Sequence, residues 1–172
     1  MHKTETENLE AILRSGQVAR YHAQPEIPAQ SMAEHQWGVA ILVIKMYSNP
    51  SKNLLMAAVT HDCAEAVTGD IPSPVKREHP EMKAVLDAIE ARVNKGWGIN
   101  YDLSEIDKRR LKICDILEGL YYSAQSVRRN HEAHHVVVSW LDYLMAYNIN
   151  KEQIAFINEC VKGTGIVHER MF

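Results

Sequence analysis

Apolar residues recur at helical spacing along almost the whole chain, and this periodicity is the strongest constraint on its fold. In residues 80–95 the apolar positions keep a period of about 3.6 residues: Met82, Val85, Leu86, Ile89 and Val93. The alternation of apolar and polar residues that is typical of half-buried strands does not occur, and the sequence contains neither internal repeats nor low-complexity runs. The sequence therefore predicts an all-α bundle of six or seven helices.

Capping residues, glycines and prolines predict where these helices begin and end. Ser31 and Glu34 form a capping-box sequence, which predicts a helix from residue 31 to about residue 48. Prolines interrupt the connections 20–30 and 70–76, and the second of these is expected to be extended. The remaining helices are expected at about residues 5–15, 52–68, 80–95, from Ser104 through Asp115, 132–147 and 151–162, with Gly16, Gly69 and Gly96 as stops.

Composition limits the classes of protein to which the chain can belong. Its 172 residues are most simply one domain, 1–172, and the net charge of −3 provides no overall basic field for a nucleic acid polymer. The longest apolar run is broken by Lys45 and is too short to span a bilayer, and no signal peptide opens the sequence. Three cysteines without CxxC spacing favour a reducing cytoplasm.

Several other side chains have an expected environment. Cys63 and Cys114 each stand beside a candidate ligand, so on a helix they are expected to face the packed side. Trp37 and Trp140 are expected in the core. Three histidines in the string HEAHH are expected on a polar surface: His131, His134 and His135.

Two histidines and two aspartates form a candidate metal-binding set. His61 and Asp62 are adjacent in an otherwise apolar segment, where burying both without a partner would cost several kcal/mol. His35 precedes them and Asp115 follows them on other predicted helices. Imidazole nitrogens and carboxylate oxygens together suit one divalent cation, whose charge the two aspartates would balance. Four ligands leave room for water and a substrate oxygen, as hydrolysis of a phosphate ester requires.

The pattern H…HD…D, followed by HDxxE and TGDxPxPVK, resembles the HD-domain phosphohydrolases. The resemblance is greatest to the bacterial 5′-deoxynucleotidases and to small phage enzymes that remove triphosphate from dATP. It covers about residues 16–125, the core of an HD domain that the C-terminal helices would complete. The resemblance implies a divalent cofactor (Co, Mn, Zn or Mg), with a second metal near Asp70 as an option, and a homo-oligomer, either a dimer or a hexamer.

The resemblance also implies roles for residues around the metal set. Glu65 matches the glutamate that is catalytic in the deoxynucleotidases, and Asp70 matches an aspartate that supports the attacking water or an additional metal. Arg20 stands at the spacing of the active-site arginine and is expected to contact substrate. Tyr21 replaces the tryptophan that packs against deoxyribose, so it is expected to favour 2′-deoxy substrates.

Lys76 and Arg77 follow the proline-containing loop and are expected to neutralise phosphate oxygens. This basic pair, together with a short interval between Asp62 and Asp115 like that of the phage enzymes, favours a dATP triphosphohydrolase that releases deoxynucleoside and triphosphate. A dNMP 5′-deoxynucleotidase that releases inorganic phosphate is the alternative.

Two remoter alternatives have specific sequence requirements. HD-type di-iron oxygenases need two further histidines between Asp62 and Asp115, and this interval contains only His79. A non-catalytic, metal-stabilised module would be indicated by the loss of a ligand or of Glu65, but every expected position is filled.

Overall fold

Helices begin where local capping sequences predict. The computed structural model describes residues 4–129 and 132–167. Helix α2 spans Met32–Met46, and Ser31 and Glu34 form the reciprocal hydrogen bonds of a capping box at its start. A second capping box precedes α1 (Glu5–Ser15), and Ser104 caps α7 (Glu105–Arg128) by accepting from the amide of Asp107.

The all-α prediction is confirmed. The other helices of the described residues are α3 (Lys52–Thr60), α4 (Glu65–Thr68), α5 (Ser73–Glu78), α6 (Pro80–Trp97), α8 (His134–Leu144) and α9 (Lys151–Val161). The described ranges thus hold nine helical segments, more than the six or seven expected, because one predicted helix is divided and one predicted extended segment is helical.

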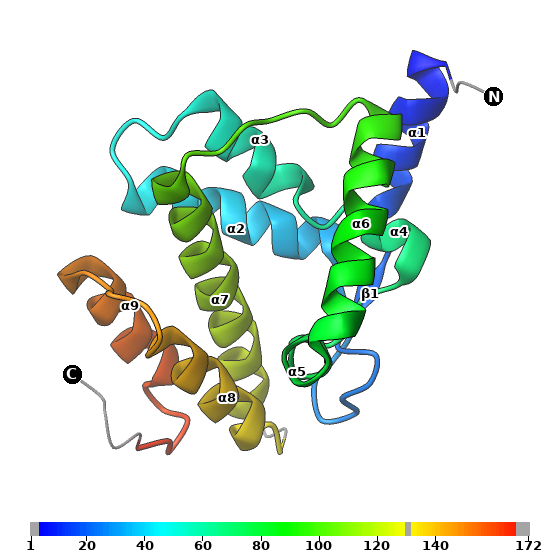
Figure 1. Ribbon diagram of the computed structural model, residues 1–172. Coiled ribbons are helices and arrows are strands. Elements are labelled where there is room, and N and C mark those ends of the chain that lie inside the picture. Colours follow the sequence, from blue (N-terminus) through cyan, green and yellow to red (C-terminus); the bar gives the residue numbers. More distant parts are fainter. Residues whose placement is uncertain (1–3, 130–131, 168–172) are drawn as a thin grey trace.

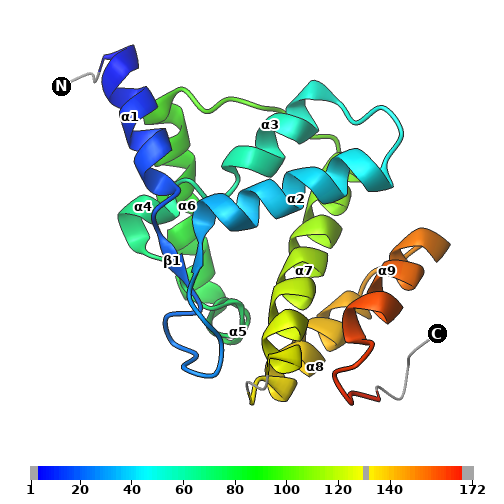
Figure 2. The ribbon, with the colours of Figure 1, turned by 180° about the vertical axis from the view of Figure 1, so that it is seen from behind.

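Helix α7 lies at the centre of the packing. Helices α2 and α3 pack against one part of it, and α8 and α9 pack against another (Figure 1). Leu117 and Leu120 are fully buried in the larger hydrophobic cluster, whereas Val39, Val43 and Leu54 lie in the smaller one. Burying each such side chain stabilises the fold by about 1.5–3 kcal/mol. Seen from behind, α1 and α6 lie beside this bundle and contact each other (Figure 2).

The predicted helix 52–68 is interrupted at the HD dipeptide. Helix α3 ends at Thr60, and residues 61–64 form turns in which the amides of Cys63 and Glu65 bond to carbonyls three residues earlier. Such tighter turns reorient successive side chains relative to a continuous α-helix. The prediction of one continuous helix over residues 52–68 is therefore wrong at residues 61–64.

The segment after Gly69 also differs from its prediction. Residues 73–78 form α5 instead of continuing an extended loop, with Pro72 as its N-cap and Pro74 in its first turn. Proline is tolerated there because the first amides of a helix have no intrahelical acceptor. Helix α6 continues through Gly96 to Trp97 and is capped by Gly98, whose left-handed φ of 70° suits glycine.

A short antiparallel ladder that the sequence did not reveal joins β1 (Ala19–Arg20) to β2 (Gln30–Ser31). Arg20 is paired directly with Gln30, and side chains directly opposite each other in a ladder lie on the same face. The ladder therefore holds the loop 21–29 at the start of α2 and places Arg20 next to that helix.

Single side chains test the remaining expectations. Cys63 and Cys114 are buried as predicted, with 1% and 0% exposure. Trp37 is 68% exposed on α2, so its assignment to the core is wrong. His131 lies outside the described residues, whereas His134 and His135 are exposed on α8.

Across residues 4–129 and 132–167, no helix combines the length and the apolar character needed to cross a bilayer.

Candidate active site

Three parts of the fold present the predicted metal ligands to one point. His35 lies in the first turn of α2, held there by the Ser31 cap, and is fully buried. His61 is the C-cap of α3, and Asp62 follows it in the turn toward α4. Asp115 lies near the middle of α7.

The distances between these side chains suit a single ion. One ligand atom from each of His35, His61 and Asp62 lies within 4.8 Å of the others. Asp62 Oδ2 is 3.6 Å from His35 Nε2 and 3.4 Å from His61 Nε2. Asp115 Oδ1 is 3.3 Å from His35 Nε2. The structure thus brings the four residues together, and their function as ligands stays a prediction.

Unpaired nitrogen atoms indicate that this donor set fits a metal ion. Within the described part of the chain, His35 Nε2 and both ring nitrogens of His61 are buried without a hydrogen-bond partner. Buried polar atoms are nearly always hydrogen-bonded, so such a cluster calls for an explanation. Coordination would use the free Nε2 lone pairs, and mixed nitrogen and oxygen donors are typical of zinc and related divalent ions.

Both aspartates of the set are held in the ionised form. Burial alone would raise the pKa of Asp62, but the electrostatic influence of the neighbouring His61 keeps that pKa below its ordinary value. Burial acts on Asp115 in the same way, yet Lys112, with Nζ 2.7 Å from Asp115 Oδ2, holds the pKa of Asp115 well below its ordinary value. Two negative oxygens are therefore available to a cation.

Glu65 is a buried carboxyl beside the donor set. Burial and the charge of Asp62 raise the pKa of Glu65 to about 8, although Lys76 opposes this shift. Lys76 Nζ donates to Glu65 Oε1 at 3.0 Å, whereas Glu65 Oε2 is buried and makes no hydrogen bond to any described residue. A carboxyl with a pKa near neutrality and one unpaired oxygen suits general acid–base chemistry.

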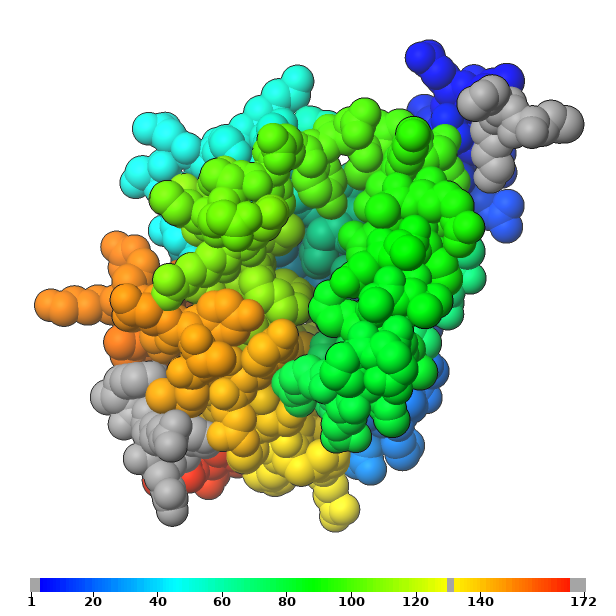
Figure 3. All heavy atoms as spheres, viewed as in Figure 1, coloured from blue at the N-terminus to red at the C-terminus, as the bar shows by residue number. Residues whose placement is uncertain are grey.

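A groove of about 500 Å³ opens over these residues. We call it the cationic groove. It is lined by five basic side chains, Arg20, Lys76, Arg77, Lys83 and Lys112, and by four acidic ones, Asp62, Glu65, Asp70 and Asp115. Figure 3 shows the molecular surface hollowed between α6 and α7. The volume of the cationic groove lies in the usual range for sites that bind small molecules.

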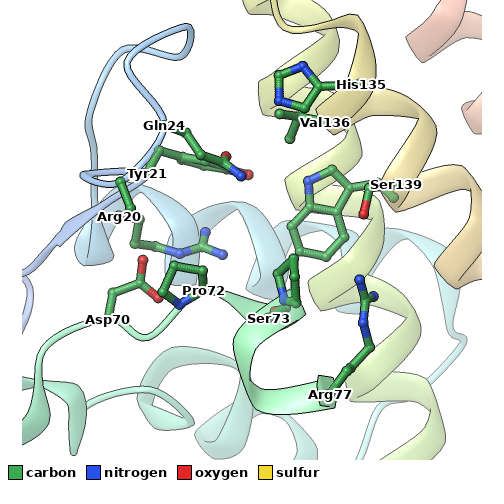
Figure 4. A pocket seen from close by; sticks show the side chains of 13 residues that line it. Arg20, Tyr21, Gln24, Asp70, Pro72, Ser73, Arg77, His135, Val136 and Ser139 are labelled. Carbon is green, nitrogen blue, oxygen red and sulfur yellow. The ribbon is translucent and has the colours of Figure 1, made fainter. Parts of the chain in front are cut away.

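A second cavity, the aromatic pocket, adjoins the cationic groove and shares Arg20, Asp70, Ser73 and Arg77 with it. In Figure 4, Tyr21 and Gln24 lie across this pocket from residues of α8. The α8 residues that line it are His135, Val136, Ser139 and Trp140.

Tyr21 has an unusual backbone conformation at the edge of the aromatic pocket. Its φ of 61° is left-handed, which is uncommon for a bulky residue and persists only where the surroundings enforce it. Its ring stacks on Tyr122 with centroids 5.5 Å apart, and its hydroxyl donates to the carbonyl of Gly119 at 3.4 Å. The tyrosine is thus held in a fixed orientation beside Arg20.

The other predicted substrate-binding and catalytic residues also reach these cavities. Arg77 lies over the ring of Tyr143, 4.8 Å from its centroid, and lines both the cationic groove and the aromatic pocket. Asp70 follows Gly69, whose φ is 75°, and lies 4.0 Å from His22. Lys76 also lines the cationic groove, but its Nζ is hydrogen-bonded to Glu65. Its predicted role in neutralising phosphate therefore has to be shared with this contact.

Sequence reasoning missed several residues of the site. Lys112 and Glu118 lie three residues before and three after Asp115, and this spacing on one helix face could have revealed both. Gln30 and Trp140 carried no comparable signal, because each comes close to the site only through tertiary packing.

Similar proteins from phages share part of this sequence. A dATP triphosphohydrolase of Salmonella phage PMBT28 is 29% identical over 124 residues, which are 64% of this chain and 63% of the phage protein. A dATP triphosphohydrolase of Cyanophage S-2L is 34% identical over 117 residues, covering 64% and 66%. These matches thus span slightly less than two thirds of each phage protein.

A bacterial relative and a solved structure extend the comparison. A 5′-deoxynucleotidase of Vibrio cholerae serotype O1 is 30% identical over 94 residues, 49% of this chain and 48% of that protein. The Cyanophage S-2L HD phosphohydrolase (DatZ), solved with dA and one catalytic Zn²⁺ ion, superposes with a TM-score of 0.66 at 23% identity, covering 95% of this chain and 98% of that one. The two proteins therefore share a fold.

The family itself follows from a longer match, which includes every predicted site residue from Arg20 to Asp115. Over residues 7–147 the sequence matches the family described as 5′-deoxynucleotidase YfbR-like, and the chain belongs to that family.

Proposed function

We propose that this protein is a metal-dependent phosphohydrolase that cleaves the 5′-phosphoester of dATP and releases deoxyadenosine and triphosphate. One observation carries the proposal: Asp62 and Asp115 of the metal-donor set line the cationic groove, and this groove adjoins the aromatic pocket at the shared residues Arg20 and Arg77. A nucleotide has the same two parts, an anionic tail and an aromatic base. Its ester bond would then lie beside Asp62 and Glu65.

We propose a divalent ion, zinc in the first instance, held by His35, His61, Asp62 and Asp115. The unpaired ring nitrogens and the two ionised aspartates support this assignment, as does the catalytic Zn²⁺ of DatZ. When bound, such an ion supplies Lewis acidity to a phosphoryl oxygen and makes a neighbouring water more acidic.

Glu65 is proposed as the catalytic acid–base residue. Its unpaired Oε2 can accept a proton from the attacking water or give one to the departing 5′-oxygen, and a pKa of about 8 allows both states near neutral pH. Lys76 holds the other oxygen of Glu65 and so fixes the direction of the carboxyl. Asp70, on the loop shared by the two cavities, is proposed to support the attacking water or a second metal.

The charge balance of the cationic groove supports a triphosphate substrate. Five basic and four acidic side chains line it, so its formal balance is one positive charge, and a divalent ion would raise this to three. A triphosphate tail carries more negative charge than a monophosphate and uses such a surplus better. The phage relatives named dATP triphosphohydrolase also support this choice.

A dNMP 5′-deoxynucleotidase is the second candidate. Three lysines of the groove are already paired with carboxylates: Lys76 with Glu65, Lys83 with Asp87 and Lys112 with Asp115. If these pairs persist when substrate binds, the cations left for phosphate are Arg77 and Arg20, and Arg20 is itself paired with Glu118. That remaining charge suits the smaller negative charge of a monophosphate. The 5′-deoxynucleotidase of Vibrio cholerae favours the same alternative.

Chromatography of a dATP digest decides between the candidates. Deoxyadenosine with intact triphosphate supports the proposal, whereas inert dATP beside rapid hydrolysis of dAMP supports the nucleotidase. Each reaction is run with zinc, cobalt, manganese and magnesium in turn, and with EDTA. The Asp62→Ala protein, purified in the same way, is the control for contaminating phosphatases, and its product formation at the wild-type rate would refute both candidates.

We also propose that the protein acts as a homo-oligomer in the cytoplasm. Helix α2 presents an apolar face to solvent, where Trp37 is 68%, Ile41 39% and Ile44 50% exposed, at helical spacing. Light scattering during size-exclusion chromatography tests this: wild-type protein is expected above the monomer mass and Trp37→Glu at a lower mass. A monomeric wild-type protein would contradict the proposal.

A further inference from the structure

Behind the metal-donor set, four buried polar side chains form a closed hydrogen-bond network centred on Glu118. Glu118 Oε2 accepts from His35 Nδ1 at 2.5 Å and from Arg20 Nη1 at 3.3 Å. Glu118 Oε1 accepts from Gln30 Nε2 at 2.6 Å, and Gln30 Oε1 accepts from Arg20 Nη1 at 2.9 Å. The four residues are between 0% and 8% exposed. These bonds are therefore largely shielded from water.

The network determines which ring nitrogen of His35 is available to a metal ion. A carboxylate can only accept a hydrogen bond, so Nδ1 of His35 must carry the proton that it shares with Glu118. Nε2 is then the ring nitrogen that can give its lone pair to a metal ion, on the side of Asp62 and Asp115. Carboxylate partners of this kind orient metal-bound histidines in many proteins, and their loss weakens metal binding.

The same oxygen that receives the His35 proton also contacts Arg20, which lines both the cationic groove and the aromatic pocket. Arg20 balances the charge of Glu118, and a buried carboxylate without such a partner would be strongly destabilised. Gln30 bonds to both of them and prevents either from turning away. One carboxylate thus holds a predicted metal ligand and a predicted substrate-binding arginine.

Backbone geometry makes room for this carboxylate. Glu118 lies three residues after Asp115 on α7 and reaches α2 at Gly38, which lies three residues after His35. A Cβ atom at Gly38 would be only 2.7 Å from Glu118 Cγ, so any larger residue would displace the side chain. The pairing of Arg20 with Gln30 across the ladder completes the arrangement.

We propose that Glu118 is a positioning residue that orients His35 for metal binding and Arg20 for substrate binding through one carboxylate oxygen, with Gln30 as its support. The part concerning Arg20 rests on the proposed function, whereas the part concerning His35 requires only that the site binds a metal. Occupancy of the metal site and affinity for the substrate are then linked through Glu118.

Glu118→Gln tests the proposal by metal affinity, measured with zinc alone against a chromophoric chelator. The amide retains the shape of the side chain but is a weaker acceptor and no longer balances Arg20, so zinc affinity should fall by roughly 10–100-fold. KM for dATP should rise as well, because Arg20 loses its charged partner. Unchanged zinc affinity in the folded variant would overturn the proposal.

Asp107→Asn is the matched control. Asp107 is a buried carboxylate on the same helix, bonded to Ser51 Oγ at 2.8 Å and to Arg110 Nη1 at 3.1 Å, and it lies away from the metal-donor set. Its replacement should lower the melting temperature and leave zinc affinity unchanged. An equal loss of zinc affinity in both variants would show that Glu118 acts only through general stability.

Two measurements keep the test decisive if Glu118→Gln does not fold. Gly38→Ala leaves the carboxylate present but displaces it, so zinc affinity should fall in the same direction by a smaller factor. Nitrogen-15 NMR of the zinc-loaded wild-type protein should show His35 protonated at Nδ1 and free of hydrogen at Nε2. The opposite tautomer would refute the proposal. Because zinc binding is read without substrate, a failure to hydrolyse dATP would count against the proposed function alone.

Discussion

Replacing Glu65 with glutamine should change how the stability of the metal-free protein depends on pH. Burial, reinforced by the charge of Asp62, raises the pKa of Glu65 from 4.5 to about 8, so the folded protein retains a proton that the unfolded chain has released. The stability from this proton is fully present below pH 4.5 and is lost as the pH rises through 8. Since one pKa unit corresponds to about 1.36 kcal/mol, the wild-type protein should lose roughly 3–5 kcal/mol relative to Glu65→Gln over this interval.

Urea unfolding of the EDTA-treated proteins measures this difference at about pH 5 and about pH 9. Glutamine stays neutral at both pH values, so the difference between the two proteins reports the ionisation of Glu65 together with its effect on the neighbouring Lys76. The unfolding free energy of the wild-type protein should decrease relative to that of the variant as the pH rises. An equal difference at the two pH values would refute the raised pKa, and with it the argument that Glu65 exchanges protons near neutrality.

Three substitutions test other parts of the site. Asp62→Ala should remove bound metal and lower activity by orders of magnitude, which metal analysis and turnover will check; substantial turnover by a metal-free variant would exclude the proposed chemistry. Tyr21→Ala should narrow the preference for dATP over ATP, measured as a ratio of kcat/KM, and equal values in the wild-type enzyme would contradict a role for Tyr21 in 2′-deoxy selectivity. Gly119→Ala should cost about 1–3 kcal/mol of stability and raise KM for dATP, because its Cβ would lie 2.7 Å from the Trp140 ring at the aromatic pocket. A variant with unchanged melting temperature and KM would show that the indole moves without consequence.

The sequence predicted best those helix ends that are fixed by interactions between residues close together in the chain. Ser31 and Ser104 cap α2 and α7 through hydrogen bonds to residues only three positions away, so a short window of sequence contains the whole interaction. The same reasoning failed at Pro74, because a proline that interrupts a helix interior is tolerated in a first turn. It also failed at residues 61–64, where HDCA contains neither glycine nor proline and nothing local predicts the end of α3.

Tertiary packing accounts for the parts of the site that sequence did not predict. The HD dipeptide and Asp115 were visible because their residue types and order form a recognisable pattern, but the network around Glu118 joins residues 83 and 88 positions apart. Glu118 alone resembles any glutamate on a long helix. It becomes informative only when α2, α7 and the β1–β2 ladder bring His35, Arg20 and Gln30 around it.

The end of α3 at the HD dipeptide depends on both the local sequence and tertiary packing. In a continuous helix, successive side chains diverge by about 100°, so His61 and Asp62 could not both point toward His35 on α2. The tighter turns at residues 61–64 allow His61 Nε2 and Asp62 Oδ2 to lie 3.4 Å apart and to face the same buried histidine. We therefore infer that the donor set imposes the local irregularity, which the local sequence alone does not signal.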